Sequence, residues 1–406
     1  MGEGAGTRPE KLEESGVNMN RRQPHEALTQ LLERFVKNGP PGCALKVTRR
    51  GETWYEHYAG YADVDTRTPI GKDTIYRIYS MSKVITCAAA LLLYERGHFL
   101  LNDPLDEYLP EFRSAEVYRR LPDGSRVREP ANRRILVKDL FTMTSGITYN
   151  GDDCDTSRAV QAALAELRRG TQRFDARALS KLIASVPLAF EPGTRWRYGF
   201  NHDVLGALIE EVSGKPFGAF LQDEIFGPLR MRDTFFRLPE EKKNRLCTMY
   251  GRSADGALSP KRDMDEAYSP EATFESGGGG LLSTIDDYER FAQMLLNGGE
   301  LDGVRILGRK TIELMATNHL NAEQLADFRW PSMAGYGYGL GVRVMIDPPA
   351  GGCNGSVGEY GWQGLAGSWT FIDPKEQMVA VYMQQMIPSL EPELHPRLRA
   401  AIYATL

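Results

Sequence analysis

The sequence predicts an α+β protein in which strands from both ends of the chain form one sheet flanked by helices. A mainly helical lobe is inserted between these two parts. Two observations lead to this prediction. Strand-like segments occur near the start of the chain and return only near its end. The intervening residues 101–330 show a succession of helical patterns, each broken by Gly or Pro.

The segment 25–100 is predicted to form the N-terminal part of the sheet domain. Apolar residues recur at helical spacing over residues 28–35, and a Gly-Pro-Pro-Gly run then ends this helix. Residues 43–59 predict a β-hairpin, because two strand-like runs flank a charged turn. Residues 1–24 are polar and lack an apolar segment, so we interpret them as a mobile tail rather than a secretory signal.

A long buried helix is predicted over residues 80–96, because its interior is apolar on all sides and Gly97 offers a natural end. The charged stretch 113–134 is expected to be an exposed excursion. Further helical patterns belong to the lobe and lie at residues 159–169, 175–183, 203–212 and 286–296.

The C-terminal part of the sheet domain is expected over residues 331–406. Its strand-like segments and its final helix lie at residues 339–345, 368–372, 378–383 and 396–404. We therefore assign residues 25–100 and 331–406 to the sheet domain and residues 101–330 to the helical lobe. We expect the active site in the cleft between them, where ligand sites commonly lie.

Composition and charge argue against several classes of partner. The chain has 406 residues and a formal net charge of −5, and its basic residues are scattered. We therefore predict no nucleic-acid partner and no membrane partner. The chain also lacks a run of about 18 apolar residues, the length that a membrane-spanning helix needs. The oligomeric state stays open.

The cysteine and histidine patterns predict no metal and no other cofactor. The five cysteines are far apart and form no CxxC pair, which is typical of reduced thiols in a cytoplasmic protein. The six histidines are isolated. The glycine run 277–280 lacks the Gly-Lys-Ser/Thr of a phosphate loop, and the acidic residues at 152–155 lack EF-hand spacing.

The segment Ser80-Met81-Ser82-Lys83 places a hydroxyl and an amine three residues apart at the start of the predicted buried helix. A serine hydroxyl becomes a good nucleophile when a base within hydrogen-bond reach removes its proton. Lysine can be that base if burial lowers its pKa, and the apolar helix supplies the burial. The pattern predicts Ser80 as nucleophile and Lys83 as its partner. An N-cap serine beside a solvated lysine is the alternative interpretation.

Tyr198 lies on a loop that leads into the predicted helix at 203–212. A phenol beside a cationic lysine has a lowered pKa and can act as a general base or acid. We predict that Tyr198 completes a Ser–Lys–Tyr relay. The alternative is an ordinary aromatic residue of the core.

The segment Gly361-Trp362-Gln363-Gly364-Leu365 is expected on an edge strand that leads into residues 368–372. Gly364 would let the backbone and a substrate approach closely. The backbone N–H groups of Leu365 and Ser80 would then form an oxyanion hole. A glycine-rich turn with a packing tryptophan is the alternative.

Taken in order, these three segments resemble the class C β-lactamase and penicillin-binding-protein superfamily of serine hydrolases, most nearly the family VIII carboxylesterases. The similarity extends to further segments, at residues 76–83, 101–112, 140–146, 276–284 and 372–374. It implies a β-lactamase-like fold with an antiparallel sheet. It also implies an acyl-enzyme on Ser80, with Lys83 and Tyr198 as catalytic partners.

Two departures from that family bear on the substrate. The strand motif of such β-lactamases usually reads Lys-Thr-Gly, and Trp362 stands in place of the lysine. Their Tyr-x-Asn motif has Phe200 at the asparagine position, with Asn201 one residue later. Losing a charge-assisted contact costs about 1.5–3 kcal/mol. We therefore expect a short uncharged carboxylic ester, bound by Trp362, Gln363, Gly364, Phe200 and Asn201.

Other activities are compatible with the same residues. The acyl-enzyme could pass its acyl group to a small-molecule acceptor instead of water. β-Lactamase, D-amino-acid amidase and peptidase activities also stay open. A non-catalytic relative that keeps only the fold is disfavoured by the presence of Ser80, Lys83 and Tyr198.

Overall fold

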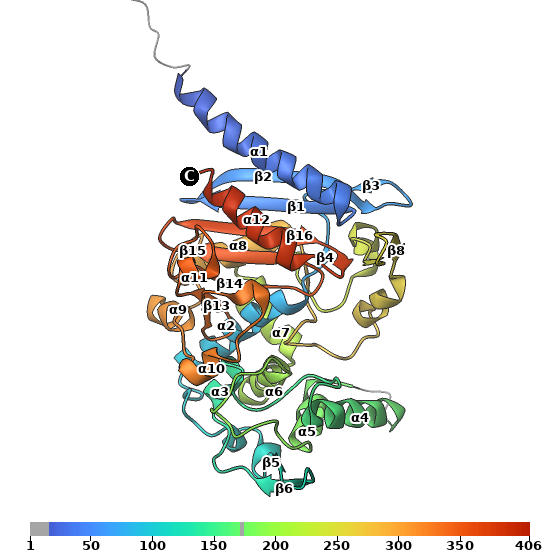
Figure 1. Cartoon of the computed structure of the whole chain (residues 1–406), viewed down its shortest axis with the longest axis vertical. Helices are drawn as coiled ribbons and strands as arrows, with labels where there is room; N and C mark the ends of the chain where they lie inside the picture. Colours follow the sequence, from blue (N-terminus) through green and yellow to red (C-terminus); the bar gives the residue numbers. More distant parts are fainter. Residues whose placement is uncertain (1–15, 171–173) are drawn as a thin grey trace, which may run out of the picture.

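The central element is an eight-stranded antiparallel sheet built from both ends of the chain (Figure 1). The structure, a computed structural model, describes residues 16–170 and 174–406. The strands, in their order across the sheet, are β12 (Tyr336–Tyr338), β13 (Arg343–Met345), β14 (Tyr360–Gln363), β15 (Trp369–Asp373), β16 (Met378–Gln384), β1 (Gly42–Arg49), β2 (Glu52–Asp63) and β3 (Thr68–Pro69). The two chain ends meet where β1 pairs with β16, and the predicted fold class is confirmed.

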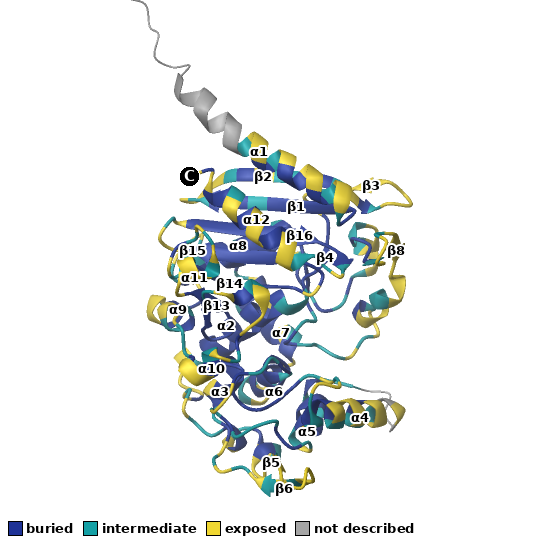
Figure 2. Cartoon of the chain, viewed as in Figure 1, coloured by how far each residue is buried: buried dark blue, intermediate teal, exposed yellow. Residues whose placement is uncertain are grey.

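Helices α1 (Gly16–Asn38) and α12 (Glu391–Tyr403) pack together over one face of the sheet. Their apolar stripes, which include Leu32 and Leu398, meet Trp369 and Tyr382 of the sheet in one hydrophobic cluster. Figure 2 shows the outer side of α1 exposed above the buried strands. Residues 16–24, part of the predicted mobile tail, continue α1 instead. Residues 1–15 of that tail lie outside the described residues.

Helix α8 (Ile285–Leu296) packs against β1, β15 and β16 on the other side of the sheet. Strands β15 and β16 are buried at every position, which explains their nearly continuous apolar sequences. Helix α8 lies within the range 101–330 that the sequence assigns to the lobe. Because α8 packs against the sheet, the division of the chain into a sheet domain and a helical lobe stays a prediction.

Helix α2 (Ser82–Glu95) lies at the centre of the molecule, beneath α8 and against α6 (Asn201–Ser213). Residues 82–93 are all buried, as the apolar pattern predicts, and Gly97 adopts a left-handed φ of 75° after the helix. A short 3-10 turn, η1 (Tyr79–Met81), precedes α2. Ser80 therefore lies in this turn, immediately before the helix proper.

Most of the remaining helices lie on the side of α2 away from the sheet (Figure 1). The remaining α-helices are α3 (Val137–Phe141), α4 (Asp155–Gly170), α5 (Ala176–Ala184), α7 (Phe217–Leu221), α9 (Arg309–Met315), α10 (Ala322–Leu325) and α11 (Pro348–Gly351), the last of which lies beside β14 and β15 instead. Single turns of 3-10 or π-helix are η2 (Leu105–Glu107), η3 (Pro110–Phe112), η4 (Gln222–Phe226), η5 (Glu240–Arg245), η6 (Arg262–Tyr268) and η7 (Pro331–Met333). Among the described residues, no helix combines the length and the hydropathy needed to cross a bilayer.

Small strand pairs connect these helices. They are β4 (Tyr76–Arg77) with β9 (Leu282–Ser283), β5 (Glu116–Arg120) with β6 (Arg126–Pro130), β10 (Glu300–Leu301) with β11 (Val304–Arg305), and β7 (Tyr250–Arg252) between β8 (Leu258–Pro260) and β17 (Met386–Ile387). The charged stretch 113–134 contains the β5–β6 hairpin, which projects from the far end of the molecule (Figure 1).

Candidate active site

The turn that carries Ser80 is held by backbone and side-chain hydrogen bonds on both sides. The Ile78 N–H donates to the Leu281 carbonyl, and the Leu281 N–H donates to Ser82 Oγ, both at 3.1 Å. Tyr79 has a φ of 42°, a conformation that costs free energy for a residue with a side chain. Ser80 is partly exposed although Ile78 and Met81 are buried. Solvent therefore reaches Ser80 although the turn is packed on both sides.

Lys83 lies three residues after Ser80, in the first turn of α2. Its side chain is fully buried and extends back toward Ser80. Its Nζ donates hydrogen bonds to Ser80 Oγ at 3.2 Å, to Tyr149 Oη at 2.9 Å and to the Gly278 carbonyl. A lysine ammonium carries three donors, so these three acceptors satisfy the protonated form completely. The structure thus brings together the two residues of the Ser-x-x-Lys segment.

The surroundings of Lys83 do not lower its pKa, which corrects the prediction made from the apolar helix. Burial alone lowers the pKa of Lys83. The phenol groups of Tyr149 and Tyr198 and the carboxyl of Asp203 outweigh burial, so the pKa of Lys83 is raised above its ordinary value. Tyr149 and Asp203 were not predicted from the sequence, because they come from segments distant from Lys83 in the chain. Lys83 is therefore an ammonium in the resting site.

Asp203 is the carboxyl that balances this buried charge. Burial raises the pKa of Asp203, and the Lys83 ammonium partly offsets that effect. The carboxylate accepts hydrogen bonds from Ser276 Oγ at 2.5 Å and from the Gly278 N–H at 3.1 Å. Asp203 thus holds the glycine-rich segment 277–280, whose Gly278 carbonyl accepts from Lys83. The segment thereby holds an acceptor for the Lys83 ammonium in place.

Tyr149 is a site residue that the sequence analysis missed. Its hydroxyl accepts the Lys83 hydrogen bond, and burial raises the pKa of this phenol although Lys83 opposes the shift. It reaches the site because Gly199 lets two loops touch. A Cβ at Gly199 would lie 2.3 Å from the Ile147 carbonyl oxygen. The available signal was its place three residues after the segment 140–146.

Tyr198 lies in the site but not in the relay geometry predicted for it. Lys83 Nζ lies 4.6 Å from the centre of its ring, a cation–π contact. Its hydroxyl accepts a hydrogen bond from Trp362 Nε1 at 3.2 Å. Within the described chain, the Tyr198 hydroxyl makes no hydrogen bond with Ser80 or Lys83. Its role as a proton carrier stays a prediction.

Strand β14 brings the third segment to the nucleophile. β14 is an internal strand of the sheet, but β13 pairs only with its first two residues, Tyr360 and Gly361. The last residues of β14 therefore have no strand partner on that side and form an edge. A Cβ at Gly364 would lie 2.4 Å from the Ile78 carbonyl oxygen, so only glycine permits this approach. No described residue accepts a hydrogen bond from the backbone N–H of Leu365 or Ser80. Both donors are free to bind an oxyanion.

Two of the predicted substrate-binding residues point elsewhere. Gln363 alternates with Trp362 along the strand, so its amide faces the opposite side and bonds Arg343 at 2.5 Å and Glu391 at 2.6 Å. The Asn201 amide is fully buried and accepts from Ser145 Oγ at 2.5 Å. Neither side chain faces the cleft. The neighbouring His202 is also fully buried.

The other predicted residues contribute to an aromatic cleft. Trp362 is buried against the rings of Tyr198, Trp330 and Tyr338, with centroids 5.2–6.2 Å apart. Phe200 packs edge-on against Tyr149 at 4.6 Å. A cavity of about 620 Å³ adjoins these rings and is lined by Tyr149, Tyr198, Trp196 and Trp330 together with polar residues. The aromatic part of this wall favours apolar groups, and the remaining lining residues, among them Asp152, Asp153, Arg197 and Asp327, are mostly polar.

One cation, Arg197, lies on the rim of this cavity, and it forms an ion pair with Asp153. A second rim carboxylate, Asp327, pairs with Arg195. These charges are therefore neutralised within the protein. The part of the chain that the structure describes contains no group of three or more His, Cys, Asp or Glu side chains arranged to hold a metal ion.

Comparison with known families identifies the group to which this arrangement belongs. Residues 28–404 match the Beta-lactamase family. The chain belongs to the Beta-lactamase family. Within it, the chain is 32% identical over 349 residues to esterase EstB of Burkholderia gladioli, covering 82% of each protein. It is 26% identical over 358 residues to monacolin J acid methylbutanoyltransferase of Aspergillus terreus, covering 83% of each.

Solved structures of the same fold include enzymes of two activities. EstCE1, described as a hydrolase with promiscuous acyltransferase activity, aligns over 95% of this chain and 100% of its own with a TM-score of 0.79 and 24% identity. Simvastatin synthase of Aspergillus terreus aligns over 94% and 98% with a TM-score of 0.81 and 23% identity. At these identities the two structures support the shared fold, and the Beta-lactamase family match supports a serine-hydrolase-type enzyme.

Proposed function

We propose that this protein hydrolyses short-chain carboxylic esters through an acyl-enzyme on Ser80. The observation that carries the proposal is the junction of η1, α2 and β14. There a partly exposed serine hydroxyl lies 3.2 Å from a buried lysine amine, beside two unpaired backbone N–H groups. Nucleophile, proton acceptor and oxyanion donors are the parts that acyl transfer needs. The similarity to esterase EstB supports the ester class.

In the proposed reaction, the unit formed by Lys83 and the tyrosines first loses one proton to solvent. Ser80 Oγ then attacks the ester carbonyl carbon while its proton passes to this deprotonated unit. The carbonyl oxygen becomes an oxyanion, to which the N–H groups of Ser80 and Leu365 donate. The bond from carbon to the alcohol oxygen then breaks, and the same unit returns the proton to the departing alcohol. Water repeats these steps on the acyl-enzyme and releases the carboxylic acid.

The cleft itself favours neutral substrates. Trp362 occupies the position at which a lysine would bind a substrate carboxylate, and the rim cation Arg197 is paired with Asp153. An anionic β-lactam would therefore find no lysine at position 362, and Lys83, the cation beside the Tyr198 ring, is already hydrogen-bonded to three acceptors. Short apolar acyl chains would bind against these rings, with about 0.8 kcal/mol for each buried methylene.

The test combines covalent labelling with a substrate comparison. A fluorophosphonate should add one label to the wild-type chain and none to Ser80→Ala, as seen by intact mass. Labelling mapped to Ser82 or Ser145 would contradict the assignment of the nucleophile. p-Nitrophenyl acetate and butyrate should have a higher kcat/KM than nitrocefin and than a D-alanyl p-nitroanilide. A higher value for either of the latter two would contradict the ester proposal.

Acyl transfer to a small-molecule acceptor is the second candidate, because an acyltransferase from Aspergillus terreus is 26% identical over 83% of this chain. The same acyl-enzyme would then react with an alcohol or amine. With p-nitrophenyl butyrate as donor, adding 1-butanol should divert product from butyrate to butyl butyrate if transfer competes. An unchanged yield of butyrate would exclude this activity for alcohols. A cytoplasmic location and the absence of nucleic-acid or membrane partners stay predictions from the sequence.

A further inference from the structure

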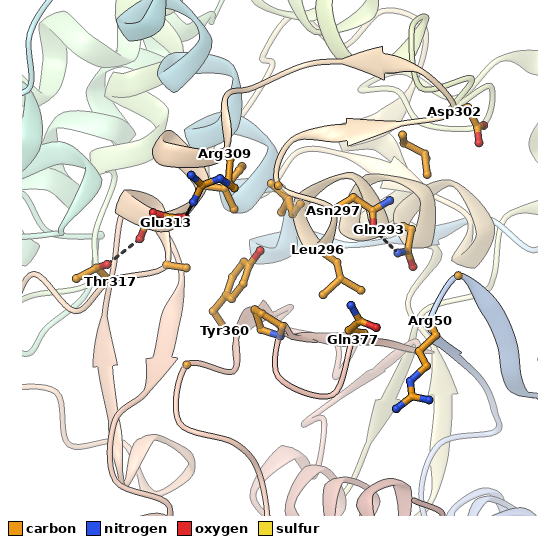
Figure 3. A pocket seen from close by; sticks show the side chains of 18 residues that line it. Arg50, Gln293, Leu296, Asn297, Asp302, Arg309, Glu313, Thr317, Tyr360 and Gln377 are labelled. Atoms are coloured by element: carbon orange, nitrogen blue, oxygen red, sulfur yellow. Dashed lines mark hydrogen bonds and ion pairs between the residues drawn. The ribbon is translucent and has the colours of Figure 1, made fainter.

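The two ends of β14 are held in different ways. At its start, β13 pairs with Tyr360 and Gly361, and Tyr360 also lines a cavity of about 1040 Å³ (Figure 3). At its end, β15 pairs with the strand as far as Gln363, but the opposite side has no strand partner among the described residues. Since one ladder of backbone hydrogen bonds is missing there, the position of this end depends more on contacts of its side chains.

The Gln363 side chain makes two such contacts. Arg343 on β13 donates from Nη1 to Gln363 Oε1 at 2.5 Å. Gln363 Nε2 in turn donates to Oε1 of Glu391, the first residue of α12, at 2.6 Å. Both partners are charged, and such hydrogen bonds are about twice as strong as those between neutral groups. The amide therefore links the end of β14 to β13 and to α12.

Arg343 depends on this amide. Its side chain is buried, and it donates to one oxygen of the described residues, Gln363 Oε1, and to the Met333 sulfur at 3.9 Å. A buried cation that loses its acceptor is destabilising. The Gln363 carbonyl is therefore kept in this orientation by the charge that it solvates.

Gln363 stands between the two residues of β14 that contact the candidate active site. Trp362 donates from Nε1 to the Tyr198 hydroxyl at 3.2 Å. Gly364 lies so close to the Ile78 carbonyl that a Cβ would meet it at 2.4 Å. Successive side chains of a strand point to opposite faces. Holding Gln363 toward α12 therefore directs Trp362 into the cleft and keeps Gly364 against the η1 turn.

We infer that Gln363 is a positioning residue of the active site, whose bonds to Arg343 and Glu391 hold the end of β14 so that the Leu365 N–H stays at the η1 turn. This role differs from the substrate binding that the sequence predicts for Gln363. The inference rests on the proposed function, because that function gives the Leu365 N–H the task of binding the oxyanion.

Exchanging donor and acceptor between β14 and α12 tests the inference. Gln363→Glu places a second carboxylate beside Glu391, which breaks the bond to α12. We expect kcat for p-nitrophenyl acetate to fall about tenfold, with KM changed less than about threefold. Adding Glu391→Gln supplies an amide that donates to the introduced carboxylate, so kcat should return to within about threefold of the wild-type value. Glu393→Gln removes an exposed carboxylate of the same helix and is the matched control, which should not restore kcat.

Titration of Ser80 with a fluorophosphonate counts the active sites in each preparation, so that kcat refers to folded enzyme only. If the wild-type chain takes up no label at Ser80, the proposed function fails, and the inference with it. If Ser80 is labelled, an unchanged kcat in Gln363→Glu would overturn the inference alone. A loss that Glu391→Gln does not restore would also overturn it, since Gln363 would then act within the cleft. Equal restoration by Glu393→Gln would overturn it as well, by showing a general effect of charge.

Discussion

At the scale of single residues, the protonation state of Lys83 decides how the proposed site works. The Lys83 ammonium makes hydrogen bonds to Ser80, Tyr149 and Gly278, and the phenols and Asp203 raise its pKa. An ammonium cannot accept the Ser80 proton, so the reactive form has lost one proton. The Lys83–tyrosine unit shares that loss, because strongly coupled groups titrate together.

The expected pH dependence follows from this state. A base whose pKa is raised is mostly protonated at neutral pH. As long as the pH stays below that pKa, each increase of one pH unit raises the unprotonated fraction about tenfold. We therefore expect kcat/KM for p-nitrophenyl acetate, corrected for spontaneous hydrolysis, to rise between pH 6 and pH 9. A profile that is flat across this range or falls would show that a group other than the Lys83 unit is the base.

The two tyrosines make separable contributions. Tyr149→Phe removes the hydroxyl that Lys83 contacts, so we expect kcat to fall about 100-fold or more, as is common when a proton-transfer group is lost. Tyr198→Phe removes an acceptor of the Trp362 N–H, and a smaller loss is expected. Steady-state kinetics with p-nitrophenyl butyrate measure the loss of kcat in each of the two variants. An equal or larger loss in Tyr198→Phe would restore the relay predicted from the sequence.

Lys83→Ala combined with Tyr149→Phe tests whether the two residues act as one unit. If they do, the double variant should be hardly less active than Lys83→Ala alone, because members of one catalytic unit are not additive. Multiplicative losses would show that Tyr149 acts independently of Lys83. The Tm of each variant, measured beside that of the wild-type chain, checks that the protein stays folded.

At the scale of secondary-structure elements, the contact between the end of β14 and the η1 turn would build the proposed oxyanion site. Gly364 makes this contact possible, because a Cβ there would meet the Ile78 carbonyl at 2.4 Å. We expect Gly364→Ala to push the strand from the turn and to lower kcat/KM at least tenfold through a displaced Leu365 N–H. Gly206→Ala on α6 is the matched control, since its nearest contact would be an ordinary 3.4 Å.

The readout for Gly364→Ala separates catalysis from folding. The substitution lies at the edge of the sheet, so its Tm should change much less than its activity. A variant that keeps full activity would show that the Leu365 N–H does not bind the oxyanion. A Tm loss as large as that of a core substitution would instead assign Gly364 a mainly structural role.

At the scale of the whole molecule, two buried histidines couple stability to pH. Burial lowers the pKa of His202 and of His395 to about 3. In the unfolded chain both regain an ordinary pKa near 6.5, so between about pH 6.5 and pH 3 the unfolded state binds more protons. The free energy of unfolding therefore falls as the pH falls, by about 1.4 kcal/mol per pH unit for each histidine.

Urea unfolding at pH 7 and pH 5 measures this effect. Replacing His395 with Gln should make the loss of stability between these pH values smaller by about 2 kcal/mol, the share of one histidine over the interval from its ordinary pKa to pH 5. His98→Gln, at an exposed position, serves as the control and should leave the loss unchanged. An unaltered loss in His395→Gln would show that His395 is protonated in the folded state.

The sequence by itself determined the properties that depend on local spacing and apolar periodicity. The sheet built from both chain ends follows from strand-like runs at residues 43–59 and 368–383, and the buried α2 follows from its all-round apolar pattern. The nearness of Ser80 and Lys83 likewise follows from a spacing of three residues at the start of a helix.

Only the tertiary structure decided which distant side chains complete the site. Tyr149 is 66 positions from Lys83 and Gly278 is 195 positions away, so no local pattern links them. The direction of the Lys83 pKa shift depends on those neighbours and on Asp203, and burial alone predicts the wrong sign. The side on which Gln363 lies depends on strand register, since a shift by one residue exchanges the two faces of a strand. Electrostatics and register are properties of assembled neighbours, and the chain acquires these neighbours only when it folds.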